Sequence, residues 1–127
     1  RAARQCTQDL AGKAGNFAPE TSASMYANYF SSLSGGSELV YTIAANYVSE
    51  FNSTGVADPA GDHDASTKID LNVRLMMENG LEIKLFGKNV TDEIVGSSSL
   101  ALPLTPGSFF KLWEPGKQFG ISIRKSF

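Results

Sequence analysis

The stretch that decides the fold is TKIDLNVRLMMENGLEIKLFGKNVTD, residues 67–92. Apolar side chains recur at every second position on both sides of the dipeptide Asn79-Gly80. Alternation with a period of two places the apolar residues of a strand on one face. Asn-Gly between two such runs is a strong signal for a tight hairpin turn. The sequence therefore predicts a β-hairpin with strands over residues 67–78 and 81–92.

The same period continues in three further segments. Residues 20–31 are rich in aromatic and small residues, and residues 38–51 alternate again after the turn sequence SLSGG at 32–36. The last segment, 117–127, alternates as well. No long segment shows the i, i+3, i+4, i+7 spacing of an amphipathic helix. We therefore expect an all-β chain that forms an antiparallel meander of five long strands.

The links between these expected strands alternate between short and long. The long links are residues 52–66 and 93–116. Long links without structure are uncommon in compact soluble domains, whereas transmembrane β-barrels have short periplasmic turns and long outer loops. The expected strands also approach the roughly 9–11 residues that a tilted strand needs to cross a bilayer. This pattern favours part of a transmembrane β-barrel, with residues 53–66 and 93–113 on the outer side.

The charged residues of the expected strands fall mainly on the face opposite the apolar one. In a membrane barrel the apolar face meets lipid and the charged face lines the lumen. The candidate lumen-lining residues are Lys68, Asp70, Arg74, Glu82, Lys84 and Arg124. In a soluble sandwich two apolar faces would pack together instead. A soluble β-sandwich binding module is therefore an alternative from a different class.

Composition limits the remaining choices. The chain has 127 residues, a formal net charge of −2, 42% hydrophobic and 19% charged residues, as expected for one folded domain. No basic patch points to nucleic acid, and no run approaches the ~20 apolar residues of a transmembrane helix. Because the sequence begins at Arg1 rather than Met, we interpret it as part of a longer protein. Its single cysteine, Cys6, is either a free thiol or half of a disulfide whose partner lies upstream.

The sequence contains no catalytic constellation, and we expect neither an enzyme nor a cofactor. It has one histidine and no phosphate-binding glycine loop. Asp58, Asp62, His63 and Asp64 crowd one long link, but their spacing fits no standard metal-binding loop, so no metal site is expected. Asn89 is expected to satisfy backbone groups where the fourth strand meets its loop.

Three stretches resemble the C-terminal barrel segment of TonB-dependent receptors of the Gram-negative outer membrane. They are DLAGKAGNFAPETSASMYANY (9–29), LEIKLFGKNVTDE (81–93) and EPGKQFGISIRKSF (114–127). The second is similar to the family pattern "slfgkNltDe", and the third is similar to the terminal pattern "epGrtfgislrysF". One departure is Lys125, where the family usually has Tyr or another apolar residue.

The resemblance implies a 22-stranded barrel with an N-terminal plug, in which this chain supplies the last five strands. The plug and the earlier strands are not within the chain. The implied function is active transport: such a receptor binds a scarce extracellular solute, a siderophore-like metal chelate or an oligosaccharide, and imports it with TonB-transmitted energy. The implied partners are outer-membrane lipid, the rest of the barrel and plug, TonB through an absent N-terminal segment, and the barrel assembly machinery. A passive porin-like outer-membrane channel is the closest alternative.

Two sets of residues follow from this expectation. Phe109, Phe110 and Trp113 lie in the second outer segment and are candidates for ligand contact, with interfacial anchoring or loop packing as the alternative. In the proteins that this chain resembles, the terminal aromatic strand is the signal that the barrel assembly machinery reads. The corresponding residues are Phe119, Ile121, Ile123 and Phe127.

Overall fold

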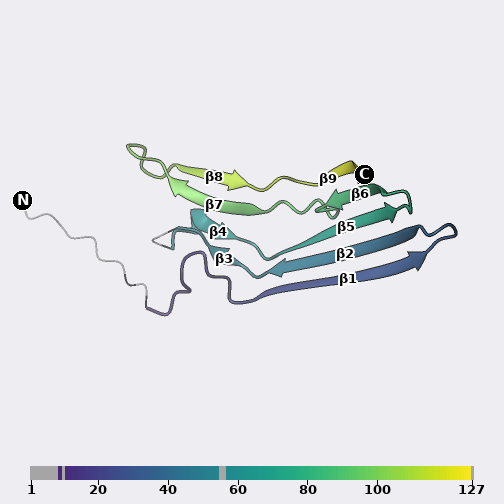
Figure 1. The fold of residues 1–127 in the computed structure, drawn as a ribbon. Helices are drawn as coiled ribbons and strands as arrows, with labels where there is room; N and C mark the ends of the chain where they lie inside the picture. The colour runs from purple at the N-terminus through teal and green to yellow at the C-terminus, as the bar shows by residue number, and fades with distance from the viewer. Residues whose placement is uncertain (1–8, 10, 55–56, 127) are drawn as a thin grey trace, which may run out of the picture.

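The structure, a computed structural model, describes residues 9, 11–54 and 57–126. Its largest element is one antiparallel sheet of five long strands in the order β1-β2-β5-β6-β9 (Figure 1). The strands are β1 (Ser22–Ser32), β2 (Glu38–Val48), β5 (Ser66–Met76), β6 (Leu81–Lys88) and β9 (Gln118–Lys125). Each long strand lies beside the long strand that precedes it in the chain. The expected five-stranded antiparallel meander is therefore confirmed.

The sheet has two faces of opposite chemistry. Every Cα pair in its four ladders joins two even-numbered or two odd-numbered residues. Because successive side chains of a strand point to opposite faces, the odd-numbered residues share one face, here named the apolar face. The even-numbered residues share the other, here named the polar face. Eight of the nine charged residues of the five strands lie on the polar face, and Lys125 alone lies on the apolar face.

The short turns lie together at one end of the sheet (Figure 1). The turn after β5 is a three-residue loop, residues 78–80, closed by the Met77 N–H donating to the Leu81 carbonyl at 2.8 Å. Gly80 has a φ of 80°, whereas Asn79 is not left-handed. A two-residue type I′ turn needs positive φ at both central positions. The Asn-Gly signal therefore predicted the hairpin correctly, and the loop that joins its strands has three residues rather than two.

The long links are not structureless loops, which corrects the sequence-based expectation. The first contains β3 (Phe51–Asn52) and β4 (Asp62–His63), joined through the short 3-10 helix η1 (Pro59–Gly61). The second contains β7 (Gly96–Ala101) and β8 (Phe109–Trp113). We name residues 51–63 and 96–113 the distal hairpins. They lie beyond the sheet at the end opposite the short turns (Figure 1).

The observed strand boundaries differ most from the expected ones at the ends of β2 and β6. The strand expected over 81–92 ends at Lys88, because Asn89 has a φ of 47° and leaves the extended conformation. The strand expected over 38–51 ends at Val48, and the chain resumes pairing only at Phe51 in a separate hairpin. Period-two alternation carried no signal for either interruption.

The described residues form no conventional hydrophobic core. Val40, which is 6% exposed, is the one buried apolar residue among them apart from glycine, and many large apolar side chains are exposed. In the part of the chain that the structure describes, no second sheet or helix covers the apolar face. Among the described residues, β1 and β9 each pair on one side only, so the sheet that they form is open at both edges. A closed barrel of 22 strands remains a prediction.

Candidate functional site

The distal hairpins pack against each other through polar side chains. Ser99 on β7 donates from Oγ to the carbonyl of Ala60 in η1 at 3.1 Å, and Ser99 is only 2% exposed. Within the first hairpin, the Asn52 amide donates to Asp62 Oδ1 at 2.6 Å and to the Asp58 carbonyl at 2.8 Å. Buried polar groups must be paired to offset desolvation. These hydrogen bonds therefore stabilise the hairpins, where few apolar side chains are buried.

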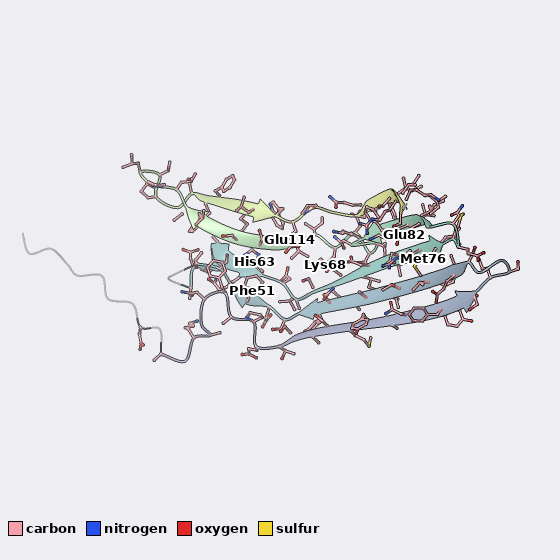
Figure 2. All side chains as sticks on the ribbon, in the orientation of Figure 1. Phe51, His63, Lys68, Met76, Glu82 and Glu114 are labelled. Atoms are coloured by element: carbon pink, nitrogen blue, oxygen red, sulfur yellow. The ribbon has the colours of Figure 1, made fainter. Side chains whose placement is uncertain are left out.

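His63 is the most enclosed ionisable side chain in this region, at 7% exposure. Its ring stacks on Phe51 with ring centroids 4.8 Å apart, and its Nε2 lies 2.7 Å from Ser53 Oγ. Figure 2 shows Phe51 and His63 together on the first distal hairpin. The sequence placed His63 in a long link with three aspartates, where no metal site was expected. No alternation pattern could have shown that its ring would be buried between two hairpins.

The three aromatic residues predicted to contact a ligand are divided between the two faces of β8. Phe109 and Trp113 share one face, and Phe110 lies on the other, opposite Leu100 of β7. Phe110 and Trp113 are exposed, whereas Phe109 is half-buried. They therefore do not form a single aromatic cluster. Ligand contact by any of them stays a prediction.

The six predicted lumen-lining residues all lie on the polar face. They are Lys68, Asp70 and Arg74 on β5, Glu82 and Lys84 on β6, and Arg124 on β9. With Glu38 and Lys88, this face carries five basic and three acidic side chains, although the chain as a whole is acidic. Towards β1 the face becomes neutral, where Ser24 donates to Asn46 Oδ1 at 2.8 Å. The excess of positive charge is therefore confined to β5, β6 and β9.

One ion pair connects the polar face to Glu114, the residue that follows the second distal hairpin. Lys68 Nζ lies 2.5 Å from Glu114 Oε2, and both side chains are partly exposed. Figure 2 shows Lys68 at the start of β5 and Glu114 beyond the end of β8. Near the middle of β5, Asn72 Oδ1 and Arg74 Nε are buried atoms without a hydrogen-bond partner in the described part of the chain. The polar face thus has unused capacity for water or a polar ligand.

The stretch around Asn89, which carries much of the family resemblance, forms a structural turn. The Asn89 N–H donates to Asp70 Oδ1 at 2.8 Å, and its side-chain amide donates to the Glu93 carbonyl at 2.9 Å. Its Oδ1 accepts from the Glu93 N–H at 3.0 Å. The Val90 N–H donates to the Ile69 carbonyl at 2.8 Å, which continues the β5 edge beyond β6. The predicted role of Asn89 in satisfying backbone groups is confirmed.

Asp92 joins this turn to the approach of β9. Its Oδ1 accepts from the Lys117 N–H at 3.0 Å, and its Oδ2 lies 3.1 Å from Lys117 Nζ. The backbone hydrogen bond from Lys117 and then the side-chain contact lower the pKa of Asp92 below its ordinary value. The turn therefore fixes where the last strand re-enters the sheet.

The predicted assembly-signal residues Phe119, Ile121 and Ile123 lie on the apolar face of β9, exposed by 61–72%. Phe127 lies outside the described residues. Phe119 is directly opposite Gly87 on β6, and a Cβ on Gly87 would lie 2.8 Å from the Phe119 ring. The tight contact covers Gly87, which is buried although it has no side chain.

A reciprocal contact lies on the other face. Phe86 is directly opposite Gly120, and a Cβ on Gly120 would overlap the Phe86 ring. The Phe-Gly dipeptide of β6 therefore pairs with the Phe-Gly dipeptide of β9, with one ring over one glycine on each face. Aromatic residues over strand glycines pin the register of a sheet. A slip by two residues would remove both contacts.

Two of the acidic residues in the first long link, Asp58 and Asp62, are engaged in hydrogen bonds. Asp58 caps η1 by accepting from the Ala60 N–H at 2.8 Å, and Asp62 is bonded to Asn52. Among the residues that the structure describes, no group of three His, Cys, Asp or Glu side chains could hold a metal ion. These carboxylates act instead as hydrogen-bond acceptors within the first distal hairpin.

Comparison of the chain with protein-family models, curated proteins and solved structures finds no match. Within the described residues, no helix has the length and apolar character needed to cross a membrane. The function must therefore be argued from the two faces of the sheet and from the distal hairpins.

Proposed function

We propose that the chain is the C-terminal part of an outer-membrane active transporter. The transporter would bind a scarce extracellular solute, a siderophore-like metal chelate or an oligosaccharide, and import it with energy transmitted by TonB. The observation that carries this proposal is the separation of charge. The polar face holds eight of nine strand charges, while the apolar face is exposed across all five strands.

The exposed apolar face supports a lipid environment. Removing a large apolar side chain from water is worth roughly 1.5–3 kcal/mol. The exposed members of this face include Met25, Tyr29, Ile43, Leu71, Leu85, Phe119, Ile121 and Ile123. A soluble β-sandwich would cover such a face with a second sheet, and the described residues supply no such layer. Lipid covers it without any further element of the chain.

The connections at the two ends of the sheet also support an outer-membrane barrel. Short turns at one end and longer hairpins at the other are the asymmetry of outer-membrane barrels. An unpaired strand edge in lipid leaves backbone groups unsatisfied at several kcal/mol each. The free edges of β1 and β9 therefore call for further strands of the same barrel. The rest of the barrel, the plug, TonB and the barrel assembly machinery are the partners in this proposal.

The distal hairpins would then face the medium, where a solute first meets the protein. Phe110 and Trp113 present exposed aromatic surface there, which suits stacking on sugars or on aromatic chelates. Farther along the polar face, Arg74, Lys84 and Arg124 supply positive charge. Exposed aromatic side chains followed by positive charges would suit an anionic chelate or a hydroxyl-rich solute.

The proposal is tested with the full-length gene product. Membranes are fractionated, and the protein is run on gels with and without boiling, because folded barrels migrate differently from unfolded ones. We expect the protein in the outer-membrane fraction with a heat-dependent change in mobility. Recovery of all the protein as a soluble monomer, with no mobility change, would contradict the proposal.

A second measurement separates active transport from passive passage. Uptake of candidate iron chelates and oligosaccharides is measured in cells with and without a collapsed proton gradient. Active import should fall to background when the gradient collapses. Uptake that persists would favour a passive porin-like channel instead.

A further inference from the structure

The contact between the distal hairpins has His63 at its centre. The ring stacks on Phe51, and its Nε2 bonds to Ser53 Oγ. Its Nδ1 and Cε1 face Gly96 at the start of β7 so closely that a Cβ on Gly96 would overlap them. The imidazole therefore contacts Phe51 and Ser53 of its own hairpin and Gly96 of the other. Because Gly96 has no side chain, the ring can approach its backbone closely.

The charges around His63 are unequal in effect. Lys111 belongs to β8 of the second hairpin, and Asp62 and Asp64 are the chain neighbours of His63. Asp62 is already engaged by the Asn52 amide at 2.6 Å. Burial and then the positive charge of Lys111 lower the pKa of His63, and the two carboxylates oppose this shift without cancelling it.

The surroundings of the second ring nitrogen, Nδ1, favour the neutral form of His63 as well. Ser53 Oγ also approaches the Gly61 carbonyl at 3.3 Å, so Ser53 and His63 share one local network. Within the described residues, Nδ1 makes no hydrogen bond. A proton added there would face the Gly96 backbone without an acceptor, at a position with little access to water. An unpaired buried charge is strongly unfavourable.

We propose that His63 is a pH-responsive contact that holds the two distal hairpins together when neutral and releases them when protonated. The partner surface is the β7–β8 hairpin, through Gly96 and the charge of Lys111. Separation would also expose Ser99, which donates a hydrogen bond to the Ala60 carbonyl across the contact between the hairpins. The inference depends only on the packing of the hairpins and not on the membrane location proposed above.

The direction of the pH dependence follows from linkage. A histidine whose pKa is lower in the folded protein than in the unfolded chain stabilises the packed state at pH values above its unfolded value of about 6.5. This contribution is lost as the pH falls through the lowered folded value. The hairpins should therefore be packed at neutral pH and separate in acid.

The experiment measures the distance between the hairpins in the full-length protein. Spin labels are placed at Ala65→Cys and Ser97→Cys in a Cys6→Ser background, and distances are recorded by pulsed electron paramagnetic resonance between pH 7.5 and 4.5. Both labelled positions are exposed. We expect one narrow distance at pH 7.5 and a second, longer distance that grows in acid. Far-UV circular dichroism at each pH controls for global unfolding.

Two variants make the result specific to His63. His63→Phe keeps the stack on Phe51 but cannot be protonated, so its distance should not change with pH. Lys111→Met removes a charge that lowers the pKa of His63, so the midpoint of separation should move to higher pH. A merely structural role for His63 would not predict this movement.

Gly96→Ala provides an independent test of the contact itself. The added Cβ should force the hairpins apart at every pH, with the circular dichroism of the sheet unchanged. A constant distance in the unsubstituted protein with intact strand signal would overturn the inference. A transition that persists in His63→Phe, or a midpoint that Lys111→Met leaves in place, would overturn it as well.

Discussion

The sheet and the distal hairpins achieve order by different means. In the sheet, backbone ladders join the strands while most apolar side chains remain uncovered. In the distal hairpins and the Asn89 turn, the buried side chains are polar and hydrogen-bonded, as Ser53, His63 and Ser99 illustrate. The sheet thus leaves its apolar side chains exposed, whereas the buried side chains of the hairpins have hydrogen-bond partners within the described residues.

An added charge should destabilise the protein far more on the apolar face of the sheet than in the distal hairpins. Leu71→Arg places a cation on the apolar face near the middle of β5, which should destabilise the full-length protein in lipid by about 2–4 kcal/mol. The measurement is urea-induced unfolding in lipid vesicles. Leu104→Arg is the matched control, because Leu104 is fully exposed between β7 and β8 and should tolerate the charge. Equal losses of stability at the two positions would contradict the expected difference between the apolar face and the distal hairpins.

The turn at Asn89 should be the next most sensitive point. Asn89→Ala removes both hydrogen bonds to Glu93 and places alanine at a left-handed φ of 47°. We expect a loss of about 2–3 kcal/mol in the free energy of unfolding. Asn89→Gly restores the backbone freedom but not the bonds, so it should recover about 1 kcal/mol of that loss. Identical stability of the two variants would show that the backbone conformation has no part in the effect.

The Phe-Gly pairs should respond to added volume. Gly120→Ala pushes a Cβ into the Phe86 ring and should cost about 1–3 kcal/mol, as overpacking does elsewhere. Phe86→Ala in the same chain should relieve most of that additional cost in a double-mutant cycle. Ser122→Ala, on the same face of β9, is the control and should have little effect. Additive losses in the cycle would mean that the ring and Gly120 do not interact.

The smallest expected effect concerns the exposed contact between Asp92 and Lys117. Because hydrogen bonding lowers the pKa of Asp92 in the folded protein, its stabilising contribution is present above the unfolded value near 4 and is lost as the pH falls further. Asp92→Asn should flatten this part of the stability curve at acidic pH, below about pH 5. Lys117→Met should flatten it less, since the backbone N–H of Lys117 remains the main donor. A larger effect of Lys117→Met would contradict this order of causes.

Sequence periodicity predicted the sheet well, because a period of two is imposed by the strand backbone itself. The positions of Lys68, Asp70 and Ile69 in the sequence were sufficient to predict the two faces. The distal hairpins were not predicted, because β3 and β4 have two residues each and leave no measurable period. The contact of His63 with Gly96 joins residues far apart in the chain, and no local pattern reports such a contact. The same limit applies to the pairing of Phe86 with Gly120.

We expect the apolar face of the sheet to meet lipid and the polar face to lie away from it. Single spin labels at successive positions 68–75 of β5 in the full-length protein, reconstituted in lipid vesicles, test it most directly. Collision rates with oxygen, which partitions into lipid, and with a water-soluble nickel chelate are measured at each position. If the apolar face meets lipid, oxygen access should peak at the odd-numbered positions, and nickel access, where present, should occur at the even-numbered ones. Odd-numbered positions that are shielded from both reagents, or that favour the nickel chelate, would contradict it.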